Sequence, residues 1–211
     1  MSWVLALDHV IVVVADLDSA AGRLYREHGL ASVAGGRHAG HGTGNRIVPL
    51  GSSYIELMAV VDGDEAASSP VGSWMGQRLV EVGEVPVALC LRTDDIEATA
   101  QRTGCKPLAM SRTRPDGVEL AWQLVALDAA MTHGLPFFIH WHVDDADHPS
   151  REHVEHRCAP IGIGWVEIGG DEDRLASWLG DHELPLRHVQ GSSGPHRFAV
   201  AVSVGEPILI G

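Results

Sequence analysis

Histidine is the residue type in this sequence with the clearest chemical potential. The chain has 13 histidines among 211 residues, and six of them lie between positions 133 and 156. Neutral imidazole is a common metal ligand, and its charge changes near neutral pH. The cluster indicates either a polar, partly exposed connector or a segment from which one or two side chains bind a metal ion. Density alone does not choose between these interpretations.

Two further segments carry polar groups at spacings that suit ligand binding. The glycine-rich stretch 35–45 includes Thr43 and Asn45, and its glycines allow either a tight hairpin or a backbone that approaches a ligand closely. In the second segment, Arg112 and Arg114 alternate along an extended stretch. Their guanidinium groups could clamp a carboxylate or a phosphate, or they could pair with acidic residues across the hairpin.

The sequence lacks the motifs of several common enzyme classes. It contains no Gly-x-Ser-x-Gly elbow, no HExxH segment and no P-loop. The three cysteines show no CxxC spacing, and the apolar or turn contexts of Cys90 and Cys105 indicate reduced thiols.

Composition and charge narrow the class of protein further. The chain is 45% hydrophobic and 20% charged, which is typical of a soluble globular protein. Its formal net charge is −13, and Lys106 is its one lysine, so nucleic acids and anionic lipids would repel it. No apolar run reaches the length of a membrane span, and no signal peptide is evident. We therefore expect a cytoplasmic protein with a small-molecule ligand and neither a nucleic-acid nor a membrane partner.

The elements that must position these side chains repeat along the chain. An apolar strand at 4–14 is followed by a helix that begins after Asp16 and ends at Gly29. Extended pieces then follow at 31–36, 45–50 and 53–61.

The same order returns when Asp16 is aligned with Asp95. A strand at 86–92 and a helix over 95–103 precede extended pieces at 107–113, 118–127 and 135–142. A third, shorter copy is visible over 163–210.

This repetition predicts five parts of the chain. They are a first unit at 1–62, a linker at 63–83, a second unit at 84–142, a histidine-rich connector at 143–160 and a third, degenerate unit at 161–211. The linker is expected to contain a short helix near 71–81.

A strand–helix–strand–strand–strand unit in tandem resembles the building block of the vicinal oxygen chelate superfamily, which includes glyoxalases and extradiol dioxygenases. The sequence is most similar to the glyoxalase-like domain group of that superfamily. The residues that carry the resemblance are LDHVIVVVADLDSAAGRL (7–24), GGRHAGHGTGNRIVPLGSSYIEL (35–57), SRTRPDG (111–117) and PFFIHW (136–141). The resemblance implies an α+β fold in which tandem βαβββ units form a curved mixed sheet around a pocket, with a third, shorter unit at the C-terminus.

In that superfamily, a pair of units holds one divalent metal ion, with ligands from the first and last strand of each unit. The resemblance therefore implies His9, Glu56 and His140 as metal ligands, with Glu56 also as the catalytic base. Ala88 stands at the remaining ligand position and cannot bind a metal. Two imidazoles and one carboxylate suit Zn, Fe, Mn, Co or Ni. His38 or His41 could replace the missing ligand, or water could.

The resemblance implies that the 35–45 loop lines the mouth of the pocket. Together with the residues argued from their own pattern, the expected substrate-binding residues are His38, His41, Thr43, Asn45, Arg112, Arg114, Trp122 and His142.

The implied function is that of a metal-dependent lyase, isomerase or dioxygenase that acts on a small oxygen-rich molecule, such as a hydroxy- or oxo-acid. Ala88 keeps a second hypothesis open, a metal-free protein that binds or sequesters a small molecule. Edge strands and the weaker third copy are compatible with a homodimer.

Overall fold

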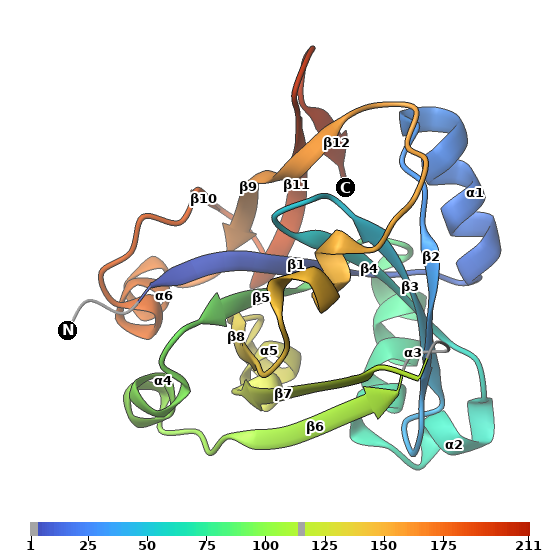
Figure 1. Ribbon diagram of the computed structural model, residues 1–211. Helices are drawn as coiled ribbons and strands as arrows, with labels where there is room; N and C mark the ends of the chain where they lie inside the picture. The colour runs from blue at the N-terminus through green and yellow to red at the C-terminus, as the bar shows by residue number, and fades with distance from the viewer. Residues whose placement is uncertain (1–3, 114–116) are drawn as a thin grey trace.

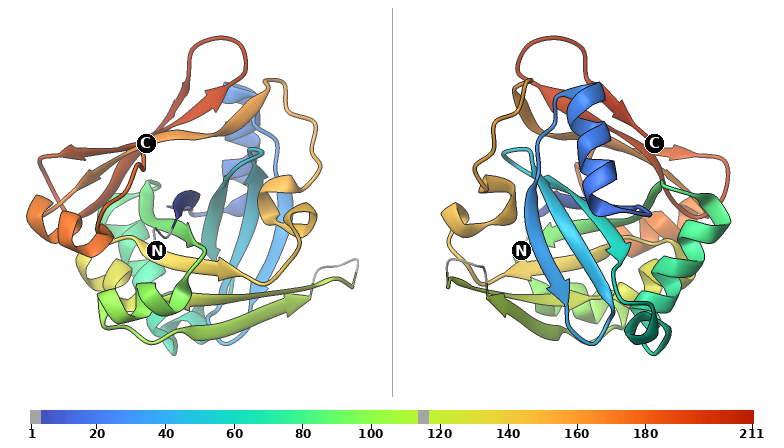
Figure 2. Two further views of the ribbon diagram at one scale, coloured as in Figure 1. Left: turned by 60° about the vertical axis from the view of Figure 1, so that its left-hand side comes forward. Right: turned by 90° about the vertical axis from the view of Figure 1, so that its right-hand side faces the viewer.

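The computed structural model describes residues 4–113 and 117–211, which form two β-sheets flanked by helices (Figure 1). The larger sheet has eight strands and the smaller sheet has four. The larger sheet curls into a half-barrel (Figure 2). The expected α+β architecture with a curved mixed sheet is therefore confirmed.

One half of the large sheet comes from the N-terminal part of the chain. Its elements are β1 (Leu5–Val13), α1 (Leu17–His28), β2 (Val33–His38), β3 (Thr43–Pro49) and β4 (Tyr54–Val60). Helix α1 begins where the Asp16 side chain accepts a hydrogen bond from the Ser19 backbone, and it ends at Gly29 with φ +74°. Strand β1 pairs in parallel with β4, so the first and last strands of this half are neighbours.

The other half repeats this order with one additional helix. Its elements are β5 (Pro86–Thr93), α4 (Ile96–Thr103), β6 (Leu108–Thr113), β7 (Glu119–Val125), α5 (Leu127–His133) and β8 (Phe137–Trp141). The sequence did not predict α5. That helix follows Ala126 at φ +69° and has no side-chain N-cap, so the usual start signal is absent.

Between the two halves lie α2 (Gly63–Ala67) and α3 (Pro70–Val82). The predicted short helix near 71–81 is confirmed as α3, which begins with a Ser69 N-cap and a proline in its first turn. The strand order across the large sheet is β2-β3-β4-β1-β5-β8-β7-β6, with β1 and β5 antiparallel at its centre.

The two faces of the large sheet pack against different elements. The inner face, which includes Ile11, Ala88 and Ile139, packs with α3 and α5. The outer face, which includes Val10 and Leu89, packs with α1, α4 and the C-terminal elements.

A β-bulge interrupts the alternation of β1. In the pairing with β5, Leu7 lies opposite Leu91 and His9 lies opposite Cys90, which leaves Asp8 as an extra residue. Leu7 and Val10 belong to the outer core, whereas His9 faces the inner side. The bulge lets the consecutive side chains of Asp8 and His9 meet.

The C-terminal segment forms the smaller sheet from β9 (Pro160–Gly169), α6 (Glu172–Leu179), β10 (Leu186–Val189), β11 (Gly194–Val202) and β12 (Ile208–Ile210). It keeps the order strand–helix–strand–strand–strand. Its pairing differs from that of the first two units, because β9 lies between β10 and β11 rather than beside its last strand.

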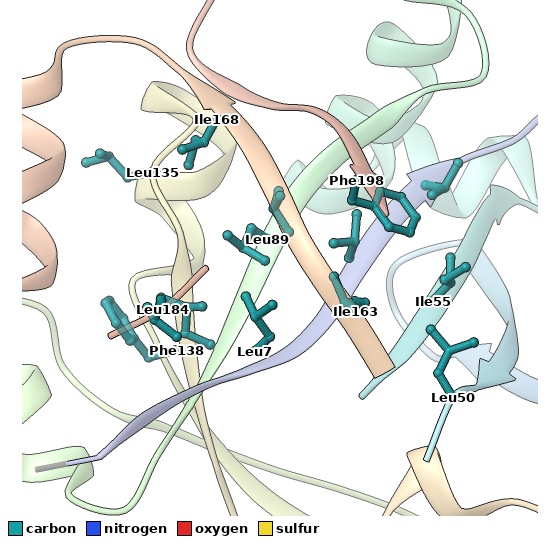
Figure 3. Close-up of a cluster of buried hydrophobic side chains, with 14 of the residues drawn as sticks. Leu7, Leu50, Ile55, Leu89, Leu135, Phe138, Ile163, Ile168, Leu184 and Phe198 are labelled. Atoms are coloured by element: carbon teal, nitrogen blue, oxygen red, sulfur yellow. The ribbon is translucent and has the colours of Figure 1, made fainter. Parts of the chain in front are cut away.

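Apolar side chains join the smaller sheet to the outer face of the large sheet. Leu89 and Phe138 lie on one side of this core, with Ile163 and Phe198 on the other (Figure 3). The outer face is therefore filled, and the inner face is left as the place for a site.

The connector between β8 and β9 contains the short 3-10 helices η1 (Asp145–Asp147) and η2 (Pro149–Arg151). Within the described residues, no helix combines the length and apolar character that crossing a membrane requires.

Candidate functional site

The inner face of the large sheet encloses a cavity of about 130 Å³. Its polar lining comes from the first half of the sheet, and the members are His9 on β1, His38 on β2, His41 in the following turn, Asn45 on β3 and Glu56 on β4. Across the cavity, the second half contributes apolar or indole side chains, namely Ala88, Met110, Trp122, Leu124, Phe137, Ile139 and Trp141.

His9 and Glu56 face each other in this cavity. Their strands are parallel neighbours, and Glu56 lies opposite Ile11, two residues beyond His9 on the same face. The distance from His9 Nε2 to Glu56 Oε2 is 3.4 Å, and both residues are buried. The His9 ring also stacks on Tyr54, with ring centroids 4.5 Å apart. Two of the three residues predicted as metal ligands therefore lie together.

Asp8 contacts the ring nitrogen of His9 that is not turned toward Glu56. The His9 Nδ1–H donates to Asp8 Oδ1 at 2.7 Å, while His148 Nε2–H and Trp141 Nε1–H donate to Asp8 Oδ2, each at 3.1 Å. Burial by itself would raise the pKa of Asp8, but the hydrogen bonds from His148 and His9 outweigh it and hold that pKa well below its usual value. An ionised Asp8 keeps a proton on Nδ1 of His9, and the ring then turns Nε2 toward Glu56.

Glu56 has two more neighbours on its Oε1 side. The Asn45 side-chain amide donates to Oε1, and His38 Nε2 lies 3.9 Å from the same atom. His38 Nδ1 is hydrogen-bonded to Thr43 Oγ1 at 3.0 Å, so both imidazoles present Nε2 to one carboxylate.

The remaining residues predicted for the pocket fall into three groups. His41 lines the cavity and is hydrogen-bonded through Nδ1 to Ser69 Oγ at 2.8 Å. Trp122 also lines it, whereas Thr43 is fully buried and hydrogen-bonded to His38. The Arg114 prediction, and the prediction for the side chain of Arg112, fall outside the described part of the chain.

His140 and His142 are placed elsewhere. Strand β8 directs Phe137, Ile139 and Trp141 into the cavity, and the alternate His140 therefore points to the opposite side of the sheet. There, His140 Nδ1–H donates to the Thr93 carbonyl at 2.9 Å. The His140 side chain lines a separate cavity of about 320 Å³. His142 Nε2 is hydrogen-bonded to Gln123 at 2.9 Å. The structure does not bring His140 to His9 and Glu56.

Asp8, His9 and Cys90 form the group of three ligand-type side chains, within the described residues, whose donor atoms lie within 4.8 Å of one another. Two features of this group oppose metal binding. Three N–H donors already occupy the Asp8 carboxylate. Burial, with the charges of Asp8 and Glu56, raises the pKa of the Cys90 thiol well above its usual value, so Cys90 remains protonated.

Sequence reasoning missed Asp8 and His148 as parts of the site. Strict strand alternation places Asp8 on the face opposite to His9, and only the bulge changes this. His148 lies in the histidine-rich connector, so the histidine count pointed to the segment but not to the residue.

Comparisons with known proteins agree with this architecture. Residues 7–184 match the sequence model of a family described as "Glyoxalase-like domain". A search of curated proteins found no match.

Among solved structures, a hypothetical protein from Staphylococcus aureus is 19% identical, with a TM-score of 0.68 over 92% of this chain and 89% of that chain. A methylmalonyl-CoA epimerase from Mycobacterium tuberculosis is 22% identical, with a TM-score of 0.44 over 64% of this chain and 85% of that chain.

Proposed function

Because the chain belongs to the glyoxalase-like domain family of the vicinal oxygen chelate superfamily, we propose that it is a divalent-metal-dependent enzyme acting on a small oxygen-rich organic molecule. The metal ligands in this proposal are His9 Nε2, the Glu56 carboxylate and His38 Nε2. His38 takes the third place because its Nε2 lies 3.9 Å from Glu56 Oε1, whereas His140 lines a different cavity. The three donor atoms do not all lie within 4.8 Å of one another, so His38 would have to move toward His9 to share one ion.

One observation carries this proposal. His9 Nε2 and a Glu56 carboxylate oxygen lie 3.4 Å apart, and with the ring proton on Nδ1 a neutral His9 would turn a lone pair toward that oxygen. Two electron-rich atoms at this distance repel each other unless a cation or a proton lies between them. Ligand atoms bound to one metal ion at about 2.0–2.2 Å are themselves about 3.0–3.5 Å apart, so this donor pair fits a shared metal ion.

The surroundings of the donors also fit a metal centre. A histidine ligand usually donates its second ring N–H to a carboxylate or another acceptor, which fixes the orientation of the ring. Asp8 has this relation to His9, and Thr43 lies beside Nδ1 of His38. Two imidazoles and a carboxylate with open positions suit Zn, Fe, Mn, Co or Ni.

In this proposal, each residue of the site has its own role in the reaction. A bound divalent cation would act as a Lewis acid on a pair of substrate oxygens. Glu56 is the base that accepts a proton from the neighbouring substrate carbon and returns it. Asn45 holds Oε1 of that carboxylate, and the apolar wall opposite excludes water from it.

A metal-free binding protein is the second candidate. It is favoured by Ala88, which stands in the cavity wall at the position where the resemblance implied a fourth ligand. In that case, a proton on His9 Nε2 would lie between His9 and Glu56.

Elemental analysis of protein purified without an affinity tag or chelator tests the proposal. We expect about one Zn, Fe, Mn, Co or Ni ion per chain in the wild type. Glu56→Gln and His38→Gln should each lower this content about tenfold or more, because each removes one of three ligands. His140→Gln is the matched control, since this histidine lines the other cavity, and it should retain the metal.

The opposite pattern would reject this arrangement. Loss of metal from His140→Gln together with retention by His38→Gln would return His140 to the ligand set. Folded wild-type protein that remains metal-free after incubation with each ion would favour the metal-free binding protein.

A further inference from the structure

The two walls of the inner cavity differ in chemistry. The polar wall belongs to β1–β4, and the opposite wall consists of apolar and indole side chains from β5–β8. Helices α3 and α5 extend the apolar wall with Val71, Trp74, Met75, Leu127, Ala130 and Met131.

Part of this apolar surface is available to a ligand. Met110 and Trp122 are half-buried rather than fully buried, and both line the cavity. Trp122 is further oriented by Trp141, with ring centroids 5.3 Å apart. Apolar side chains that only filled a core would be covered on every side.

We propose that this apolar wall is a binding subsite for an uncharged ring or branched alkyl group of the substrate. The inference rests on the proposed function, because it concerns the same cavity, and it names the substrate class. The substrate has its paired oxygens at the His9–Glu56 end and an apolar group directly beside them, held against Met110, Trp122 and Leu124.

The size of the cavity limits that group. A dry engineered cavity of about 150 Å³ accepts one benzene molecule, and this cavity measures about 130 Å³. Three methionines of this wall, Met75, Met110 and Met131, and Met58 on β4 line the cavity, and their flexible side chains adapt to differently shaped groups. The volume therefore limits the group to about one phenyl ring or a short branched chain, and these methionines would move to make room for the rest of the substrate.

Two uncharged probes that share one polar end test this subsite. Hydroxyacetone and 2-hydroxyacetophenone carry the same pair of vicinal oxygens and differ in a methyl or a phenyl group. Burial of the phenyl ring should make 2-hydroxyacetophenone bind about ten- to a hundredfold more tightly in calorimetric titrations of the purified protein.

Variants of the apolar wall locate the preference. Met110→Ser and Trp122→Ala should each lower the preference for the phenyl probe over hydroxyacetone about threefold or more. Met110 is half-buried on the edge strand β6, so we expect Met110→Ser to fold. Gln123→Ala is the matched control, because Gln123 is on the same strand as Trp122 but contacts His142 on the opposite face.

Three results would overturn the inference. They are failure of the phenyl probe to bind, equal affinity for the two probes, and a preference that both wall variants leave intact.

The Glu56→Gln variant separates this inference from the proposed function. A phenyl preference that appears in both Glu56→Gln and the wild type, when the wild type takes up no metal after incubation with each ion, supports the subsite and rejects the metal-dependent enzyme. A stoichiometric metal ion in the wild type without any phenyl preference rejects the subsite and supports the metal-dependent enzyme.

Discussion

At the scale of single residues, the site depends on how one buried carboxylate is satisfied. Asp8 is inaccessible to solvent and accepts hydrogen bonds from His9, His148 and Trp141. A buried charge is tolerated when donors of this kind surround it. The same bonds orient His9 toward Glu56, so the stability of the charge and the geometry of the site have one origin.

Asp8→Asn tests this link through stability and pH. The folded pKa of Asp8 is lowered from 3.8, so the ionised carboxylate stabilises the fold above about pH 4 and this contribution is lost as the pH falls toward the folded pKa. We expect Asp8→Asn to lower the free energy of unfolding by about 2–3 kcal/mol at pH 7. The difference from the wild type should shrink below about pH 4 in urea denaturation.

The exposed Asp181→Asn provides the control and should change the unfolding free energy by less than about 0.5 kcal/mol. A difference between Asp8→Asn and the wild type that stays constant from pH 7 to pH 3 would contradict this role of Asp8.

At the scale of elements, a short turn sets the position of two histidines that line the cavity. The turn between β2 and β3 carries His41, and His38 precedes it. Its glycines at 40 and 42 both have positive φ angles, +79° and +63°. A Cβ atom on Gly42 would lie 2.4 Å from the Asp62 carbonyl oxygen, whereas one on Gly40 would meet nothing within 4 Å.

Gly42→Ala should therefore be more disruptive than Gly40→Ala. Both substitutions carry the cost of a left-handed alanine, about 1 kcal/mol. Gly42→Ala must in addition move the backbone that packs on α2, and we expect a total loss of about 2–4 kcal/mol. Thermal unfolding of the two variants side by side measures the difference, and equal losses would show that the close contact with Asp62 does not constrain the turn.

At the scale of the whole molecule, the outer face of the large sheet contributes to the apolar core and the inner face to ligand binding. The smaller sheet fills the outer face, where Phe198 is fully buried against the apolar side chains of the large sheet. The inner face holds the cavity. Stability and ligand binding can therefore be changed independently.

Phe198→Ala tests this separation. Removing a fully buried phenyl ring should lower the free energy of unfolding by about 3–5 kcal/mol. The affinity for 2-hydroxyacetophenone, measured well below the unfolding temperature, should stay within about twofold of the wild type. Val204→Ala, at a side chain that is 88% exposed, should change neither quantity. A large loss of affinity in folded Phe198→Ala would show that the two faces are coupled.

The sequence alone determined the elements and much of the polar wall. Apolar strands, Asp N-caps and glycine stops are local signals, so the order of the two βαβββ units could be predicted from them. The resemblance of those units added the placement of His9 and Glu56, which lie together in the cavity.

Tertiary structure decided the rest of the candidate site. Alternation correctly groups Phe138, His140 and His142 on one side of β8, but it does not say which side of a curved sheet is the inner one. That side is set by what packs against each face. Phe138 is buried in the outer core, and His140 therefore lies away from Glu56.

The bulge at Asp8 and the contact with His148 were likewise beyond local signals. A bulge depends on the register between β1 and β5, and His148 reaches Asp8 from 140 residues away along the chain. Side chains from such distant segments meet only when the packed sheet and its connector hold them together, because no local preference encodes a long-range contact.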